Sequence, residues 1–253
     1  MDEGALRIRS AGAGKVAATE RGWRLEIPPG TSKEYRLAQI DDYSGRRRAE
    51  FLWRPPFELG LRARVSSRHV PGTWGFGLWN DPFGLACGPT REVARLPALP
   101  QAAWFFAASS RSYLSLRDDQ PANGRFAQVL RSQRAGSWLA AAAITLPIDR
   151  REARRRLSGN IREIAAGVDV DPGAWHRYEI RWHDSSIRFE IDGQELILAR
   201  AAPRAPLGLV IWIDNQYAAF DPQGKLAWGL EVNPEKAWLE IDEFKCWRTP
   251  SGE

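Results

Sequence analysis

Two segments of the chain end in the same short pattern, a tryptophan followed two residues later by an aspartate. The segment GTWGFGLWNDPFG ends this way with Trp79 and Asp81, and the segment LVIWIDNQY with Trp212 and Asp214. Because strand alternation puts every second residue on one face, each tryptophan shares a face with its aspartate. An indole beside a carboxylate can hold a sugar or another polyol ring, by stacking on its apolar side and by hydrogen bonds to its hydroxyl groups.

The glycines that precede Trp79 indicate that this face is open. Glycine within a strand marks a place where a ligand or another backbone approaches closely. In the first segment, the face that carries the Trp and the Asp consists of Thr73, Gly75, Gly77, Trp79 and Asp81. In the second segment, the corresponding face consists of Val210, Trp212, Asp214 and Gln216. We therefore predict a cleft in which Trp79, Asp81, Trp212 and Asp214 bind a ligand. Asn215 and Tyr217 are expected near its rim. The alternative is that each aspartate only begins a turn, as Asp-Pro and Asp-Asn often do.

The same carboxyl groups are also candidates for acid–base chemistry. A partly dry cleft lined by tryptophan raises the pKa of a buried carboxyl, so that it can act as an acid near neutral pH. The catalytic candidates are Asp81 with Asp214, or Asp41 with Asp42 beside Tyr43. A pair that works on one glycosidic bond must lie within about 5–10 Å across one pocket. Carboxyl groups at opposite rims, or used as turn caps, would exclude this chemistry.

Residue types and spacing give no support for a metal or cofactor site. The histidines are His69, His176 and His183, and the last two fall on opposite faces of one predicted strand. The two cysteines, Cys87 and Cys246, lie far apart in the sequence, so no zinc-binding spacing exists, and whether they pair stays open. The chain contains no phosphate-binding loop, no dinucleotide-binding glycine pattern at a strand–helix junction and no nucleophile elbow. We expect neither a metal nor a cofactor.

The elements that must position these residues are mostly short strands. They are rich in aromatic residues or alternate in polarity, and Pro, Gly, Asp or Ser bounds them. The strands are expected at 23–27, 34–40, 57–65, 74–78, 102–108, 112–116, 175–183, 187–191, 195–198, 207–213 and 238–247. Asp192-Gly193 predicts a tight hairpin turn. Many short antiparallel strands predict an all-β sandwich or jelly roll, here as one domain over residues 1–253.

One segment departs from the strand pattern. The apolar run at 138–146 is followed by an Arg-rich stretch at 147–164, which is predicted to be helical. Asp149 can cap this helix with Glu152 three residues on, and the positions Ala153, Leu157, Ile161 and Ile164 would form one apolar stripe. We interpret 138–166 as an insertion that packs its stripe on the sandwich. The alternative is an interfacial helix for anionic lipid or nucleic acid, but the stripe is narrow and carries no Trp or Phe.

Composition sets wide limits on function. The 253 residues are 43% apolar, which is enough for a large core, and the twelve tryptophans suit ligand grooves as well as cores. The net charge of +5 permits anionic partners without requiring them. The N-terminal residues show no basic-then-apolar signal and no apolar run is long enough to cross a bilayer, so a soluble cytoplasmic protein is expected. Nothing in the sequence indicates an oligomeric state.

Four stretches together resemble the laminarinase/lichenase-type glycoside hydrolases (family 16) of the concanavalin A-like lectin/glucanase superfamily. They are Asp42–Gly45 with FELGLRARV at 57–65, GTWGFGLW at 72–79, the hairpin WHRYEIRWHDSSIRFEIDG at 175–193, and LEIDEFKCW at 239–247. The hairpin is the most specific of these. The resemblance implies a jelly roll of two curved antiparallel sheets with a concave ligand face, interrupted by a helical insertion around 147–166.

The catalytic strand of that family, Glu-x-Asp-x-x-Glu, has no counterpart where it should follow the cleft strand. The segments 104–109 and 112–117 contain no acid, and the run Glu240-Ile-Asp-Glu243 falls in the terminal strand, where we interpret it as unrelated to catalysis. A protein that binds a carbohydrate or another amphipathic small molecule, without the hydrolytic chemistry, is therefore the first hypothesis. An enzyme with relocated acids Asp81 and Asp214 is the second. A module that binds anionic surfaces through its Arg-rich helix is the third.

Overall fold

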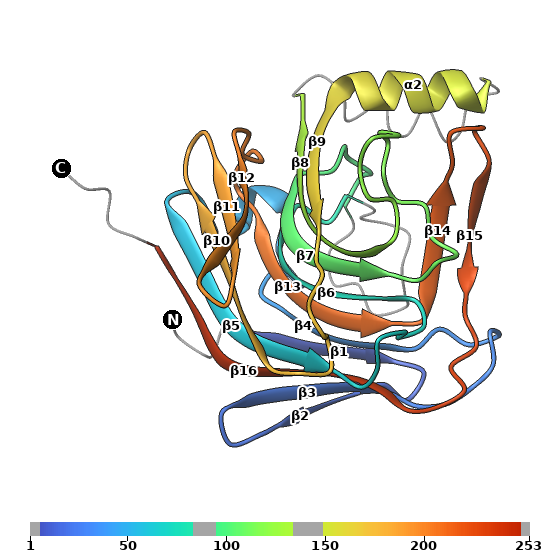
Figure 1. Ribbon diagram of the computed structural model, residues 1–253, viewed down its shortest axis with the longest axis vertical. Coiled ribbons are helices and arrows are strands. Elements are labelled where there is room, and N and C mark those ends of the chain that lie inside the picture. Colours follow the sequence, from blue (N-terminus) through green and yellow to red (C-terminus); the bar gives the residue numbers. More distant parts are fainter. Residues whose placement is uncertain (1–5, 83–94, 134–148, 249–253) are drawn as a thin grey trace.

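A computed structural model of the chain describes residues 6–82, 95–133 and 149–248. Two seven-stranded antiparallel sheets pack face to face (Figure 1). Sheet 1 has the order β1-β4-β13-β6-β7-β8-β9, with the bounds Arg7–Ala11, Leu37–Asp41, Gly208–Asp214, Thr73–Trp79, Ala102–Ala108, Gly124–Ser132 and Ile161–Gly167. Sheet 2 has the order β12-β11-β10-β5-β16-β3-β2, with the bounds Gln194–Ala199, Ile187–Ile191, His176–Trp182, Phe57–Val65, Ala237–Arg248, Gly22–Ile27 and Lys15–Ala18. The expected all-β jelly-roll sandwich is confirmed.

The hydrophobic core lies between the sheets. Alternation along the strands gives each sheet an apolar face, and these two faces meet there. The ring of Phe76 on β6 packs 5.2 Å from that of Tyr178 on β10, and Phe105 on β7 lies 5.2 Å from Phe189 on β11. These side chains are almost completely buried. Since alternation commits Phe76 to the core, its neighbours Gly75 and Gly77 face the other side of sheet 1.

Strand pairing over long sequence distances sets the register around the predicted cleft. β13 lies between β4 and β6, so Trp212 pairs with Gln39 on one side and with Gly75 on the other. β1 then adds the edge strand, where Arg9 pairs with Gln39. Residues directly opposite each other in a sheet share a face. This row of sheet 1 therefore runs from Arg9 across Gln39 and Trp212 to Gly75.

Two further elements lie against the face of sheet 1 that points away from sheet 2. One is the hairpin of β14 (Gln216–Phe220) and β15 (Leu226–Leu230), which begins directly after β13. The other is the helix α2 (Arg150–Asn160), drawn across the top of Figure 1. Arg154 of α2 donates hydrogen bonds to the backbone oxygens of Phe220 and Ser115. The helix therefore supports the outer end of the hairpin.

The predicted helix is confirmed only over its first part. Asp149 caps α2 by accepting a hydrogen bond from Arg151 N at 3.1 Å, as expected. However, the helix ends at Asn160 and the following seven residues form β9, which pairs with β8 along its full length. Ile161 and Ile164 therefore do not share one helical stripe, and that part of the prediction is wrong. Ile161 packs on the outer face of sheet 1, whereas Ile164 packs against the core.

Other expectations fall differently. The segment 112–116 is not a strand and makes only an isolated bridge at Tyr113. The nine-residue strand β8 was not expected. The apolar run at 138–146 and Cys87 lie outside the described residues, whereas Cys246 is buried in the core. In the described ranges, no helix is long and apolar enough to cross a membrane.

Candidate functional site

Aromatic rings cover the centre of sheet 1 on its outer face. Tyr43 lies 5.9 Å from Trp79, Trp79 lies 5.8 Å from Trp104, and Trp104 lies 5.8 Å from Trp212, measured between ring centroids. Phe106 closes the group at 5.2 Å from Trp212. These are ordinary distances for interacting aromatic rings. We call Tyr43, Trp79, Trp104, Phe106 and Trp212 the aromatic floor.

The glycines of β6 make room for this floor rather than leaving it open. A Cβ on Gly75 would lie 2.7 Å from the indole carbon Cη2 of Trp212, and one on Gly77 would lie 2.7 Å from Cβ of Trp104. The Trp212 ring is also held by its Nε1, which donates to Thr73 Oγ1 at 2.9 Å. The sequence interpretation of a glycine-lined cleft is therefore corrected. The indole of Trp212 covers Gly75, the Cα and Cβ of Trp104 lie against Gly77, and the aromatic rings form the surface that a ligand would meet.

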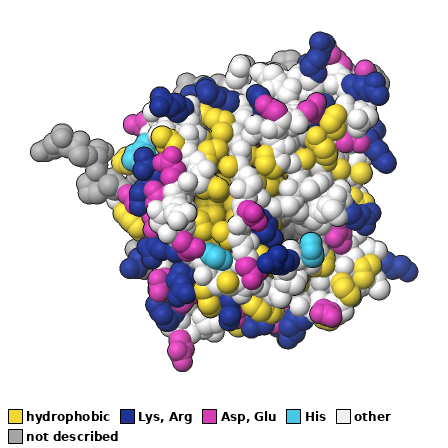
Figure 2. Space-filling view, in the orientation of Figure 1, with side chains coloured by type: hydrophobic (Ala, Val, Ile, Leu, Met, Phe, Trp, Pro, Cys, Tyr) yellow, Lys and Arg dark blue, Asp and Glu magenta, His cyan; other side chains and the backbone are white. Residues whose placement is uncertain are grey.

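A cavity of about 180 Å³ lies over the aromatic floor. Arg9 and Gln39 from β1 and β4 contribute to one wall, and the hairpin contributes Gln216 and Tyr217 to another. Trp104 and Trp212 are each 8% exposed, whereas Trp79 keeps an intermediate exposure. The residues that line the cavity are thus mostly apolar, with polar groups on its walls. Figure 2 shows bands of hydrophobic surface on this side of the molecule, with charged side chains between them and around the edge.

Asp214 lines the cavity at the end of β13. Its Oδ1 accepts hydrogen bonds from Thr73 Oγ1 at 2.8 Å and from Gln216 N at 3.1 Å, and its Oδ2 accepts one from Tyr35 at 3.3 Å. Burial raises the pKa of this carboxyl to about 6, although these donors act in the opposite direction. The side chain therefore ties β13, β6 and the hairpin together while it faces the cavity.

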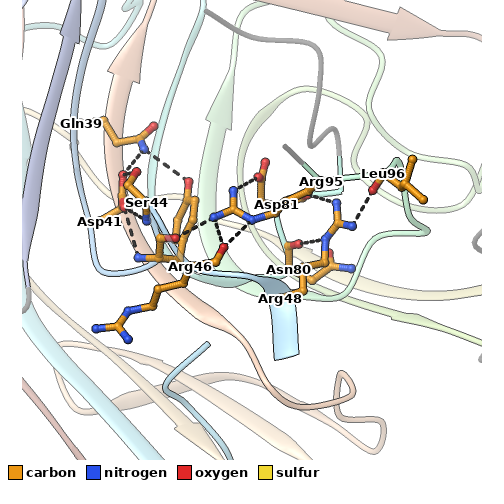
Figure 3. Close-up of polar contacts among 10 residues, drawn as sticks. Gln39, Asp41, Ser44, Arg46, Arg48, Asn80, Asp81, Arg95 and Leu96 are labelled. Carbon is orange, nitrogen blue, oxygen red and sulfur yellow. Dashed lines mark hydrogen bonds and ion pairs between the residues drawn. The ribbon is translucent and has the colours of Figure 1, made fainter. Parts of the chain in front are cut away.

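Asp81 lines the same cavity but is neutralised by a buried arginine. Arg95 Nη1 donates to Asp81 Oδ2 at 2.7 Å, and both side chains are less than a tenth exposed (Figure 3). The same guanidinium also bonds to the backbone oxygens of Tyr43 and Arg46. The backbone of Asp81 has a positive φ of 46°. Asp81 therefore belongs to a buried network that fixes the chain after β6.

The strand register separates the two catalytic candidates. Asp214 pairs with Thr73 at the start of β6, whereas Asp81 follows Trp79 at its end. Thr73 and Trp79 lie six residue steps apart, which is about 20 Å along the strand. Two carboxyl groups that hydrolyse one glycosidic bond lie about 5–9.5 Å apart. Asp81 and Asp214 thus share a cavity but stand at its opposite ends.

The other proposed pair, Asp41 with Asp42, has structural partners. Asp41 accepts hydrogen bonds from Gln39 and from the backbone and hydroxyl of Ser44. Asp42 accepts one from the indole of Trp53 and one from Leu209 N, and burial raises its pKa to about 7. Neither aspartate lines the cavity. These carboxyl groups hold the turn after β4 and do not face a ligand.

Of the two residues expected at the rim, Asn215 and Tyr217, only one lines the cavity. Tyr217 lines the cavity from the hairpin. Asn215 does not, and its expected place at the rim is wrong. It is fully buried, its Oδ1 accepts from Arg36 N, and its Nδ2 donates to the backbone oxygens of Glu34 and Glu231. Because its amide is used for these backbone groups, it locks the turn between β13 and β14.

Several cavity residues were missed by the sequence interpretation. Trp104 and Phe106 alternate along β7, and this alternation was the sequence signal for two large aromatic side chains on one face. Gln39 and Arg9 line the cavity because of strand pairing, and Tyr35 lines it from the segment just before β4; no local pattern reveals these positions. Within residues 6–82, 95–133 and 149–248, no group of three or more His, Cys, Asp or Glu side chains is arranged to hold a metal ion.

The comparisons with known proteins show similarity in structure only. No protein-family model and no curated protein matches the sequence. An endo-β-galactosidase from Clostridium perfringens that releases GlcNAcα1-4Gal matches in structure with a TM-score of 0.50 and 12% identity, over 100% of this chain and 61% of that one. An endo-acting O-glycanase of the human gut microbiota matches with a TM-score of 0.50 and 11% identity, over 97% and 92%.

The catalytic domain of LamA from Zobellia galactanivorans matches with a TM-score of 0.49 and 11% identity, over 92% of this chain and 80% of that one. At such identities the similarity shows the fold alone. The chain has a concanavalin A-like jelly-roll fold of two antiparallel sheets.

Proposed function

We propose that this protein binds a carbohydrate, or another small ring compound with one apolar side, in the cavity over the aromatic floor. The observation that supports the proposal most strongly is the unbroken set of rings from Tyr43 through Trp79 and Trp104 to Trp212, with polar groups on the surrounding walls. Sugar rings stack on aromatic faces through their C–H side, and their hydroxyl groups need hydrogen-bond partners around the edge.

The size of the cavity limits what it encloses. Pockets for drug-sized ligands usually measure about 300–1,000 Å³, whereas this cavity measures about 180 Å³. It therefore suits one ring rather than a buried oligosaccharide. Four aromatic residues that line the cavity are only partly buried and would be contacted first by such a ring, namely Tyr35, Trp79, Phe106 and Tyr217. The rest of a longer ligand would extend into solvent.

Hydrolysis is the alternative, and one observation favours it. Asp214 faces the cavity with a pKa raised to about 6 by burial, which suits a proton donor. The second carboxyl is the difficulty. Among the described residues that line the cavity, Asp81 is the other carboxylate, and it is ion-paired with Arg95 at the opposite end. Binding without turnover accounts for this arrangement better than two-carboxylate catalysis does.

The third hypothesis, an Arg-rich helix that binds anionic surfaces, receives less support from the contacts of α2. Arg154 is largely buried and bonds to the hairpin, and Arg155 and Arg156 both pair with Glu152. Arginines used inside the fold or paired on the helix surface leave less charge for a lipid or nucleic acid. The helix therefore serves mainly to support the hairpin wall of the cavity.

A ligand panel with matched tryptophan variants tests the proposal. Wild-type protein is titrated with neutral and acidic methyl glycosides and short oligosaccharides by calorimetry, and each mixture is assayed for released reducing sugar. Trp79→Ala should weaken binding at least about 2- to 12-fold, since an aromatic contact contributes about 0.5–1.5 kcal/mol beyond its buried area. Trp247→Ala is the control, because this side chain is 41% exposed on sheet 2.

Trp79→Phe keeps a ring and should lose less affinity than Trp79→Ala, which separates a stacking role from a general loss of folding. Unchanged affinity in Trp79→Ala would contradict the proposal. Release of sugar that disappears in Asp214→Asn would instead establish the hydrolytic alternative.

A further inference from the structure

Arg9 differs from the other charged groups around the cavity. It is the cationic residue among the described residues that line the cavity. Its neighbours Ile8 and Ser10 are exposed, whereas Arg9 is partly buried, as expected for a side chain that lies over the face of sheet 1. Within the described parts of the chain, its guanidinium has neither an ion pair nor a hydrogen bond. Most other arginines near the cavity are used by the fold, as Arg95 and Arg36 show.

The negative charges of the cavity are already compensated. Asp81 has Arg95 as its partner at 2.7 Å. Asp214 accepts hydrogen bonds from Thr73, Gln216 and Tyr35. It also lies two strands across and two residues along the sheet from Arg9, which puts their backbones about 12 Å apart. Within the described parts of the chain no ion pair or hydrogen bond joins Asp214 to Arg9, and the carboxylate is held by its own donors instead.

Asp41 is nearer, but it is also satisfied. In the strand register it lies opposite Arg7 rather than Arg9. It is fully buried and accepts hydrogen bonds from Gln39 and Ser44. A guanidinium that faces an apolar cavity without a carboxylate partner favours an anion there, since its five donors match a carboxylate with two parallel hydrogen bonds.

The register places this guanidinium at the edge of the aromatic floor. Arg9, Gln39 and Trp212 occupy one row of sheet 1 on three successive strands. Two strand spacings amount to about 10 Å between the backbones of Arg9 and Trp212. A sugar ring that lies on the floor would therefore have its edge toward Arg9, at a distance that a long side chain can bridge.

From this geometry we infer that the ligand is an acidic sugar, and that Arg9 binds the carboxylate on its ring. The inference rests on the proposed function, because it assumes that a ring occupies the aromatic floor. It goes further by naming the class of sugar and the residue that selects it. Arg9 acts as a specificity-determining residue, which distinguishes a ring with a carboxylate from the same ring with a hydroxymethyl group.

Matched pairs of ligands test the inference. Methyl β-D-glucuronide is compared with methyl β-D-glucoside, and methyl α-D-galacturonide with methyl α-D-galactoside, since the members of each pair differ only at C6. We expect the acidic member to bind about 10- to 100-fold more tightly, which is the range for a hydrogen bond to a charged group. Arg9→Gln should bring the affinity for the acidic member of each pair down to that for the neutral member, and Arg9→Lys should retain part of the preference.

Arg7→Gln is the matched control, because it removes the same charge from the same strand at an exposed residue that does not line the cavity. Equal affinity for both members of each pair, or an acidic sugar unaffected by Arg9→Gln, would overturn the inference while the proposed function stands. A sulfated sugar that binds more tightly than the uronide would overturn the choice of carboxylate. If no member of either pair binds, the proposed function fails and the inference fails with it.

Discussion

The substitution Gly75→Ala places a methyl group where the indole of Trp212 now lies. The added Cβ would be 2.7 Å from Cη2 of that ring and 2.5 Å from the backbone oxygen of Phe105 on the next strand. Ordinary contacts begin at 3.4 Å, so the ring must retreat by about 0.7 Å and the strand must shift as well. Overpacking of this kind costs about 1–3 kcal/mol.

The net effect is smaller, because alanine is favoured over glycine in a strand by about 0.5–1 kcal/mol. We expect the free energy of unfolding to fall by about 1–2 kcal/mol. With an m-value of about 3 kcal/mol/M, the midpoint of urea denaturation should fall by about 0.3–0.7 M. The displaced indole should also lose its hydrogen bond to Thr73 Oγ1 and narrow the cavity, so ligand affinity should fall in parallel.

Gly167→Ala is the matched control on β9 of the same sheet. A Cβ there has no heavy atom within 4 Å, so this variant should be as stable as the wild type or slightly more stable. If Gly75→Ala and Gly167→Ala show the same midpoint, the reasoning that β6 glycines exist to seat the aromatic floor is refuted.

Two further predictions concern stability. Burial raises the pKa of Asp42 to about 7 and that of Asp214 to about 6, both above the ordinary aspartate value of 3.8, so the folded state takes up protons that the unfolded chain does not. The stabilisation from these groups is fully present below about pH 4 and is lost as the pH rises through 6 and 7. The free energy of unfolding in urea should therefore fall between pH 5 and pH 8, and a rise across this range would contradict the burial of these carboxyls. Separately, Arg154→Ala should destabilise the protein by about 1–3 kcal/mol, since it leaves the backbone oxygens of Phe220 and Ser115 without their donor. The exposed Arg155→Ala should change stability by less than about 0.5 kcal/mol, and equal effects would show that α2 does not support the hairpin.

Alternation along single strands predicted many of the residues that line the cavity. The positions Thr73, Trp79 and Asp81 on one segment, and Trp212 and Asp214 on another, all line the cavity as their period of two predicts. This worked because each strand has a core face of apolar residues that leaves only one choice for the opposite face. The jelly-roll class followed from the same patterns, repeated over many short segments.

Contacts between strands that lie far apart in the chain could not be predicted from local sequence patterns. Arg9 reaches the cavity because β1 pairs with β4, and β4 with β13, and this order depends on the packing of the whole sandwich. The opposite ends occupied by Asp81 and Asp214 also follow from antiparallel register, which neither segment shows alone. The end of α2 was misjudged for a related reason. Ile161 and Ile164 fit helical spacing, but pairing with β8 gives this segment a full ladder of hydrogen bonds.

Asn215 shows a different limit. An exposed-looking polar residue after a strand suits a ligand rim or a turn equally well, and its neighbours in the sequence do not decide between them. The outcome depends on the backbone groups of Arg36, Glu34 and Glu231, which only the folded chain brings within reach. Tyr217, two residues later, does line the cavity.

The most direct test of ligand binding over the aromatic floor is a crystal structure of the protein with the tightest-binding sugar from the panel. The account predicts one sugar ring stacked on Trp79 beside Trp104 and Trp212, with the edge of the ring toward Arg9. A sugar bound elsewhere, such as on the outer face of sheet 2, with the cavity over the aromatic floor left empty, would contradict it.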